Sequence, residues 1–127
     1  MAEEWHAPYD RLSRETITRH QALRSLMEEL EAIDWYRQRA DDCADPALKD
    51  VLLHNMREEI EHAMMVLEWL RRNDGDFAER MDVYLYSSAP ILEIERAAEA
   101  GNRPPAPPAP PARPERATSR FTVGPLR

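Results

Sequence analysis

The sequence of 127 residues contains one cysteine, Cys43, and only three glycines. A single cysteine excludes an internal disulfide and any metal site built from several thiolates, so we expect a protein of the reducing cytosol. The sequence also lacks a run of about 18 apolar residues, which a membrane-spanning helix would need. Its first ten residues lack the basic start and apolar stretch of a signal peptide. We therefore expect neither a membrane protein nor a secreted protein.

Basic charge is scarce in most of the chain. Residues 1–100 hold 12 basic and 23 acidic side chains, whereas residues 101–127 hold 5 and 1. Binding to nucleic acid depends on neutralising phosphates, so the acidic charge of residues 1–100 argues against a nucleic-acid partner. The same charge suits the concentration of cations near the surface.

Two long stretches lack internal proline and glycine and predict long helices. The first runs from about Ser13, a good N-cap, to about Asp41. The second begins at Pro46, after the capping residue Asp45, and ends at Asn73. Period-2 patterns typical of strands are absent, so the predicted class is all-α. We expect an antiparallel two-helix hairpin that completes a four-helix bundle by dimerisation, since so short a hairpin buries little apolar surface alone.

The rest of the chain divides by composition. We expect a flexible N-terminal arm over 1–12 and a helical domain over 13–101. That domain includes a helical or irregular piece between Phe77 and Tyr86 and a short C-terminal helix starting near Pro90. Seven of the twelve residues from 103 to 114 are proline, so residues 102–119 are predicted to form an extended linker of about 3.1 Å per residue.

Each long helix carries an apolar stripe that is interrupted by ionisable residues. The spacing of these stripes, alternately three and four residues, predicts the inward face of a packed helix. In the first helix the stripe contains Glu29, and in the second it contains Glu59 and His62. The stripes are Ala22, Leu26, Glu29, Ile33 and Tyr36, and Leu48, Leu52, Asn55, Glu59, His62, Val66 and Trp69.

In an antiparallel hairpin that turns near Cys43, residues whose numbers add up to about 88 lie level with each other. Glu29 then lies level with Glu59, and His62 is one turn away. Glu-x-x-His places a carboxylate and an imidazole on one helical face, and this donor set suits iron or manganese. Di-iron helical bundles require twice this set, which two copies of the chain would supply.

Other interpretations of these residues remain open. The motif can arise by chance, and a buried polar cluster can fix helix register without binding metal. Met56, Met64 and Met65 are more typical of core filling than of a copper site. Glu28 and Glu31 form either a solvated acidic face or a route for cations towards Glu29. Tyr36 is either a core residue or a neighbour of the metal centre.

Three segments, Met27–Tyr36, His54–Met64 and Leu67–Arg72, resemble the encapsulated ferritins, the ferritin-like cargo of encapsulin nanocompartments. The resemblance implies a ferroxidase that oxidises Fe(II) at a di-iron centre formed across a dimer interface, within a ring-shaped decamer. It implies Glu29, Glu59 and His62 of both chains as catalytic ligands, Glu28 and Glu31 as a secondary metal site on the way in, and Tyr36 beside the centre. Another di-metal enzyme, such as a peroxidase or manganese oxidase, would use the same ligands.

The last eight residues, 120–127, resemble the peptide that docks such cargo onto the inner wall of the encapsulin shell. Its apolar and small residues are Phe121, Val123, Gly124 and Leu126, and Pro125 stands where a serine is common. The resemblance therefore implies a shell protein as partner, a location inside the compartment, and mineral storage of the oxidised iron there.

Overall fold

The computed structural model describes residues 4–101, which are all-helical and contain no strand. A short 3-10 helix, η1 (Tyr9–Arg11), precedes α1 (Arg14–Asp42) and α2 (Pro46–Asn73). Two shorter helices follow, α3 (Gly75–Tyr84) and α4 (Ile91–Glu99). The chain divides into two units between Leu85 and Tyr86, and the first unit contains η1 to α3.

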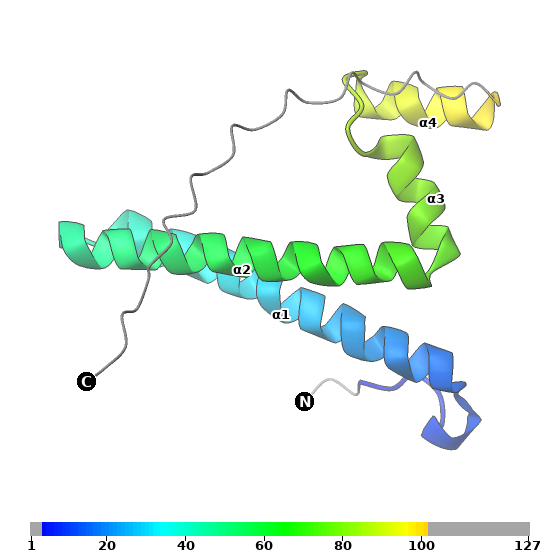
Figure 1. The fold of residues 1–127 in the computed structure, drawn as a ribbon, viewed down its shortest axis with the longest axis horizontal. Helices are drawn as coiled ribbons and strands as arrows, with labels where there is room; N and C mark the ends of the chain where they lie inside the picture. The colour runs from blue at the N-terminus through cyan, green and yellow to red at the C-terminus, as the bar shows by residue number, and fades with distance from the viewer. Residues whose placement is uncertain (1–3, 102–127) are drawn as a thin grey trace, which may run out of the picture. The chain divides into compact units, whose positions relative to one another are not determined.

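The helices α1 and α2 form the predicted antiparallel hairpin, in which they pack against each other and cross at an angle (Figure 1). The Ser13 hydroxyl accepts a hydrogen bond of 3.1 Å from the Thr16 amide and caps α1. The Asp45 carboxylate accepts one of 2.7 Å from the Leu48 amide and caps α2, with Pro46 in the first turn. Such caps satisfy amides that a helix start leaves unpaired. The connection is therefore limited to residues 43–45.

The core between the long helices is small. Leu26 of α1 packs against Ala63 and Leu70 of α2, and the last two are fully buried. Ala22, Ile33, Val66, Leu67 and Phe77 pack around this cluster. The methyl group of Ala63 leaves room for the close approach of α1, because a larger side chain at this buried position would have to push the helices apart.

The predicted inward stripe of α2 is wrong in part. Its most buried residues, Met56, Ala63 and Leu70, follow one another at intervals of seven and lie beside the predicted stripe. Two residues of that stripe, Leu48 and Trp69, are 51% and 37% exposed. The physical reason is that α2 carries two adjacent apolar stripes, and a single partner helix, α1, can cover only one of them.

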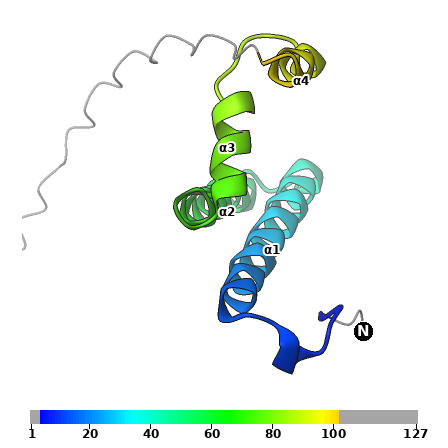
Figure 2. The same ribbon diagram turned by 90° about the vertical axis from the view of Figure 1, so that its right-hand side faces the viewer.

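The corner between α2 and α3 is organised by Asp74. Its amide ends α2 by donating to the Leu70 carbonyl, and its carboxylate caps α3 by accepting from the Asp76 amide at 3.1 Å. The same carboxylate lies 3.5 Å from Nε of Arg19 on α1. Figure 2 shows α3 leaving the end of α2 at a steep angle. Asp74 thus connects the three α-helices of the first unit.

Replacement of Asp74 by alanine is expected to lower the free energy of unfolding by about 1 to 2 kcal/mol, the range for loss of an N-cap. The Arg19 pair adds little, since the Arg19 side chain is 38% exposed and solvent screens it. Chemical denaturation followed by circular dichroism checks this. Asp76→Ala, at an exposed position of the same helical turn, is the control, and an equal loss of stability in both variants would contradict the capping role.

Residues 4–12, here called the N-terminal strap, contact α1 in the structure. The centroid of the Trp5 ring lies 4.2 Å from that of the His20 ring. Trp5 also meets the Tyr9 ring edge to face, with the centroids 5.2 Å apart. The Glu4 carboxylate lies 3.9 Å from Nε2 of His20. These contacts give the segment more structure than the flexible arm expected over residues 1–12.

The second unit contains α4, which begins after Pro90 as the sequence predicts. Ile94 is buried, whereas Ile91 and Leu92 are exposed. Tyr86 has a φ of 61°, which is uncommon for a residue other than glycine, at the boundary between the units. No helix within residues 4–101 is long and apolar enough to cross a membrane. The predicted linker, 102–119, and docking peptide, 120–127, lie outside the described residues.

Candidate metal centre

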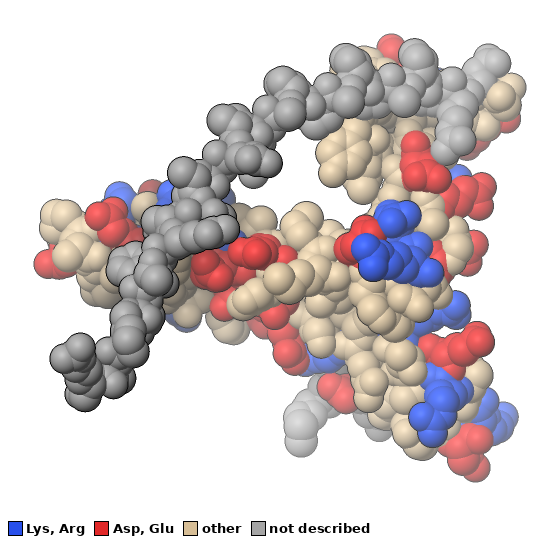
Figure 3. Space-filling view, viewed as in Figure 1, with Lys and Arg blue, Asp and Glu red and all other residues tan. Residues whose placement is uncertain are grey.

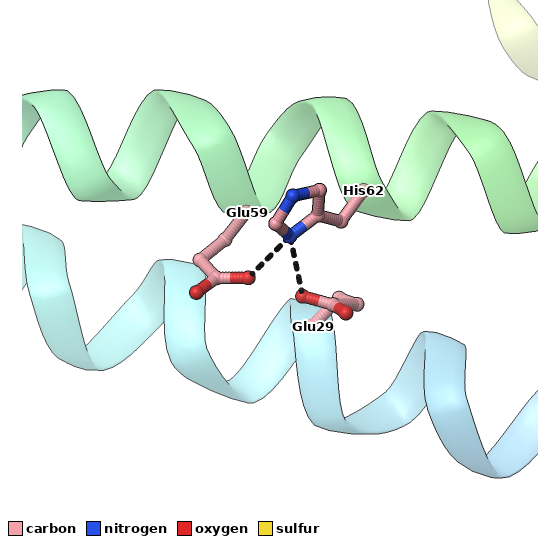
Figure 4. A group of neighbouring side chains, drawn as sticks. All are labelled: Glu29, Glu59 and His62. Atoms are coloured by element: carbon pink, nitrogen blue, oxygen red, sulfur yellow. Dashed lines mark hydrogen bonds and ion pairs between the residues drawn. The ribbon is translucent and has the colours of Figure 1, made fainter.

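The structure brings Glu29, Glu59 and His62 together in the middle of the hairpin (Figure 4). Nδ1 of His62 lies 3.1 Å from a carboxylate oxygen of Glu59 and 3.7 Å from one of Glu29. One potential ligand atom from each side chain lies within 4.8 Å of the others. We call these three residues the trio, and no other such group of histidine, cysteine or acidic residues occurs within residues 4–101.

Helical geometry explains how the trio assembles. Glu59 and His62 are three residues apart on α2, so their side chains leave the helix on the same face. Glu29 reaches them from α1, as the register count for an antiparallel hairpin predicts. Ala63 is fully buried next to His62, which keeps the two helices close at this height.

Hydrogen bonds within the trio shift the protonation of all three side chains. Hydrogen bonding between the two carboxyl groups raises the pKa of Glu29 and lowers the pKa of Glu59. The bond with Glu59 also raises the pKa of His62 and stabilises its imidazolium form. Any proton that Glu29 or His62 holds would compete with a cation for the same atoms.

The trio is open on one side. The side chains of Glu29 and Glu59 are 25% and 24% exposed, and that of His62 is 47% exposed. Three ligand atoms do not fill the octahedral coordination that hard divalent ions prefer. The types of ligand atom thus fit iron or manganese. The three atoms that one chain supplies are only part of the coordination that such an ion needs.

Exposed apolar side chains lie beside this opening on α2. Leu48, Val51, Met65 and Trp69 recur with His62 at helical spacing and are 51%, 53%, 60% and 37% exposed. We call these four residues the outer stripe. Figure 3 shows acidic side chains gathered over the middle of the long helices, with uncharged surface around them. An apolar surface of this kind next to an incomplete site is typical of an interaction surface.

The other predicted site residues lie outside the trio. Glu28 is exposed and pairs with Arg24 at 3.7 Å, and Glu31 is exposed one turn further along α1. The Tyr36 ring is partly buried and lies beneath the Arg39 guanidinium, 5.3 Å away. The structure thus does not join these residues to the trio within one chain.

Sequence reasoning missed two neighbours of the site. Glu58 acts through its charge on His62, whose pKa it helps to raise, and pairs with His54 at 3.7 Å. Arg24 approaches both Glu28 and Glu4. The i,i+4 spacings of His54 with Glu58 and of Arg24 with Glu28 were the available signals. The contact with Glu4 could not be anticipated, because it depends on how the strap folds back.

The chain is similar to several known proteins. A curated protein of Rhodospirillum rubrum, named encapsulated ferritin-like protein, is 54% identical over 96 residues, which cover 76% of this chain and 69% of that protein. A ferritin-like protein of Thermotoga maritima is 42% identical over 102 residues, covering 80% and 90%. A crystal structure of a Nitrosomonas europaea protein matches with a TM-score of 0.67 at 47% identity, covering 70% of this chain and 98% of that one. The model of the EncFtn-like family matches residues 4–88, and the chain belongs to that family.

Proposed function

We propose that this protein is a ferroxidase, which oxidises Fe(II) to Fe(III) at a di-iron centre formed between two copies of the chain. The observation that carries the proposal is the trio, in which two carboxylates and an imidazole converge beside an exposed apolar stripe. Membership of the EncFtn-like family supports it, as does the relative named encapsulated ferritin-like protein.

Iron is the substrate that the donor set favours. Carboxylate oxygens are hard ligands, and a single imidazole adds one nitrogen. Anionic ligands stabilise Fe(III) more than Fe(II), because the oxidised ion carries more charge. Glu29 and Glu59 would therefore favour loss of an electron by the bound ion. Dioxygen or peroxide would accept the electrons.

A second copy of the chain would complete the site. Two trios related by a two-fold axis supply four carboxylates and two imidazoles, the set found in ferritin-like di-iron bundles. The outer stripe offers a surface for this pairing, since burying its exposed apolar side chains is favourable. Dimers of this kind would build the ring-shaped decamer that the family resemblance implies.

Two acidic residues and one tyrosine are proposed to assist. Glu28 and Glu31 are exposed next to Glu29 on α1, where their charge would attract cations towards the centre. Tyr36 lies two turns from Glu29 on the same helix, and we propose that it lies beside the completed centre.

Anaerobic titration with Fe(II), followed by addition of oxygen, tests the proposal. We expect binding of two irons per pair of chains and rapid oxidation once oxygen is added, with pairing measured in the same sample by sedimentation. Absence of iron binding would instead favour a polar cluster that only fixes helix register. Binding without oxidation of iron, but with turnover of peroxide or manganese, would favour another di-metal enzyme.

Cation binding at the centre is expected to release protons and to weaken as pH falls. The pKa of His62 is raised above its ordinary value of 6.5, so the imidazolium persists to higher pH and must lose its proton before a metal can bind. The raised pKa of Glu29 acts in the same direction, since its carboxyl must be deprotonated to bind a cation. Mn(II) titration calorimetry in two buffers of different ionisation enthalpy counts these protons. Fewer protons should be released by His62→Ala, and affinity that does not change with pH would contradict the assignment.

We also propose that residues 120–127 dock the protein inside an encapsulin shell and that residues 102–119 act as the spacer. The name of the Rhodospirillum rubrum relative supports this destination. Deletion of residues 120–127 is expected to abolish loading when the chain is produced together with a shell protein, as seen by density-gradient separation. Iron oxidation by the truncated chain should persist. The double substitution Phe121→Ala with Leu126→Ala should reproduce most of the effect. Normal loading of both the truncated chain and this variant would contradict the proposal.

A further inference from the structure

The guanidinium of Arg24 lies between two carboxylates. Its Nε atom is 3.6 Å from Oε1 of Glu4 and 3.7 Å from Oε1 of Glu28. Both distances exceed the range of about 2.7 to 3.2 Å for a good hydrogen bond. One nitrogen is thus shared almost equally by two carboxylates, one from the N-terminal strap and one from α1.

The strap holds Glu4 in this place. The Trp5 ring beside Glu4 packs against the His20 ring, with the ring centroids 4.2 Å apart and the planes tilted by 37°. The Glu4 carboxylate also lies 3.9 Å from Nε2 of that histidine. Glu4 is therefore a positioned partner for Arg24, although its side chain is 53% exposed. Glu28 is 66% exposed and forms an ion pair with Arg24.

We infer that Arg24 controls access of cations to Glu28 and that Glu4 of the strap is its alternative partner. The inference rests on the proposed function, in which Glu28 collects cations for the neighbouring centre. While Arg24 pairs with Glu28, it neutralises the carboxylate and repels an arriving divalent ion. When Arg24 moves onto Glu4, Glu28 becomes free. Cation binding at Glu28 and pairing of Arg24 with Glu4 therefore favour each other.

The inference predicts whether each substitution raises or lowers the affinity of cations for Glu28. Glu4→Gln leaves Arg24 with Glu28 alone, so cations should bind Glu28 more weakly. Arg24→Gln removes the competitor, so they should bind more tightly. Both changes should be about two- to fivefold in affinity, because the groups are exposed and such pairs are worth little individually. In the Arg24→Gln background, Glu4→Gln should have no further effect, and this non-additivity distinguishes the mechanism from a general change of surface charge.

The experiment uses the full chain carrying Glu59→Gln, which disables the centre so that Mn(II) binding reports on the outer site. Free Mn(II) is measured by electron paramagnetic resonance during titration. Glu28→Gln should remove the class of binding that the other variants modulate. Glu15→Gln and Arg14→Gln are the charge-matched controls, since both positions are exposed on the first turn of α1.

Opposite shifts for Glu4→Gln and Arg24→Gln, with no effect of the former in the double variant, would support the inference. It would be overturned by shifts equal to those of the controls, by additive effects, or by unchanged binding in Glu28→Gln. These outcomes do not depend on oxidation. A protein that shows the coupling but does not oxidise iron would therefore refute the proposed function and leave the control by Arg24 standing.

Discussion

Replacement of Glu59 by glutamine is expected to lower the rate of Fe(II) oxidation by at least about 100-fold, since even outer partners of metal ligands are worth about 10- to 100-fold. Glu59 lies 3.1 Å from Nδ1 of His62 and also shifts the pKa of Glu29, so it interacts with both other members of the trio. Glutamine has nearly the same shape but carries no negative charge and offers one oxygen instead of two. It would neither hold two cations nor stabilise their oxidised state. Stopped-flow absorbance after mixing with Fe(II) in air measures the effect.

Glu29→Gln and His62→Ala should behave in the same way, because each removes a different corner of the site. The control is Glu79→Gln, an exposed acidic residue on α3 that lies outside the trio. Circular dichroism should show unchanged helix content in every variant. If all three trio variants oxidised iron at the parent rate, the trio would not be the reaction centre.

Replacement of Met65 by glutamate is expected to abolish rapid oxidation without unfolding the chain. Met65 is 60% exposed and lies one turn from His62, so the new charge is solvated in a single chain. In the proposed pair it would be buried at the interface, where an unpaired charge costs several kcal/mol. The dissociation constant of the pair should therefore rise by at least about 100-fold, because each 1.4 kcal/mol changes it by a factor of ten. Sedimentation velocity and the oxidation rate, measured on one sample, check both effects.

Met64→Glu is the matched comparison, since Met64 is 51% exposed but leaves the helix about 100° away from Met65. It should retain much more oxidation activity than Met65→Glu. Subunit mixing gives a second readout. If centres form only between two chains and pair at random, equal amounts of parent and Glu59→Gln chains should give about a quarter of the parent activity. About half would indicate that each chain works alone and would contradict the shared centre.

The hairpin could be predicted from sequence because its signals are local. The capping residues Ser13 and Asp45 determine where the two long helices begin, and Pro46 follows Asp45 in the first turn of α2. These signals involve only residues near each other in the sequence. The long uninterrupted patterns then leave few alternatives to two antiparallel helices. The same register brings Glu29 level with Glu59, so the trio could also be predicted to assemble.

The inward face of α2 could not be assigned from sequence alone. Spacings of three and four residues fit Leu48 and Trp69 as well as Met56 and Leu70, and only packing against α1 decides which set is buried. Periodicity reports that a face is apolar but not what covers it. The position of Glu4 beside Arg24 could not be predicted from sequence for a different reason. A long-range contact of a short irregular segment leaves no periodic pattern in the sequence.

The three-residue connection at Cys43–Asp45 sets an order of events during synthesis. Contacts between the ends of α1 and α2 next to this turn are close in sequence, and helical topologies rich in local contacts fold within microseconds to milliseconds. Encounter of two chains at cellular concentrations is slower, since typical association rate constants are about 10⁵ to 10⁷ M⁻¹s⁻¹. Each hairpin would thus be complete before it meets another. If the proposed shared centre is correct, a newly made chain would carry its trio in place yet remain inert towards iron until enough copies had accumulated nearby.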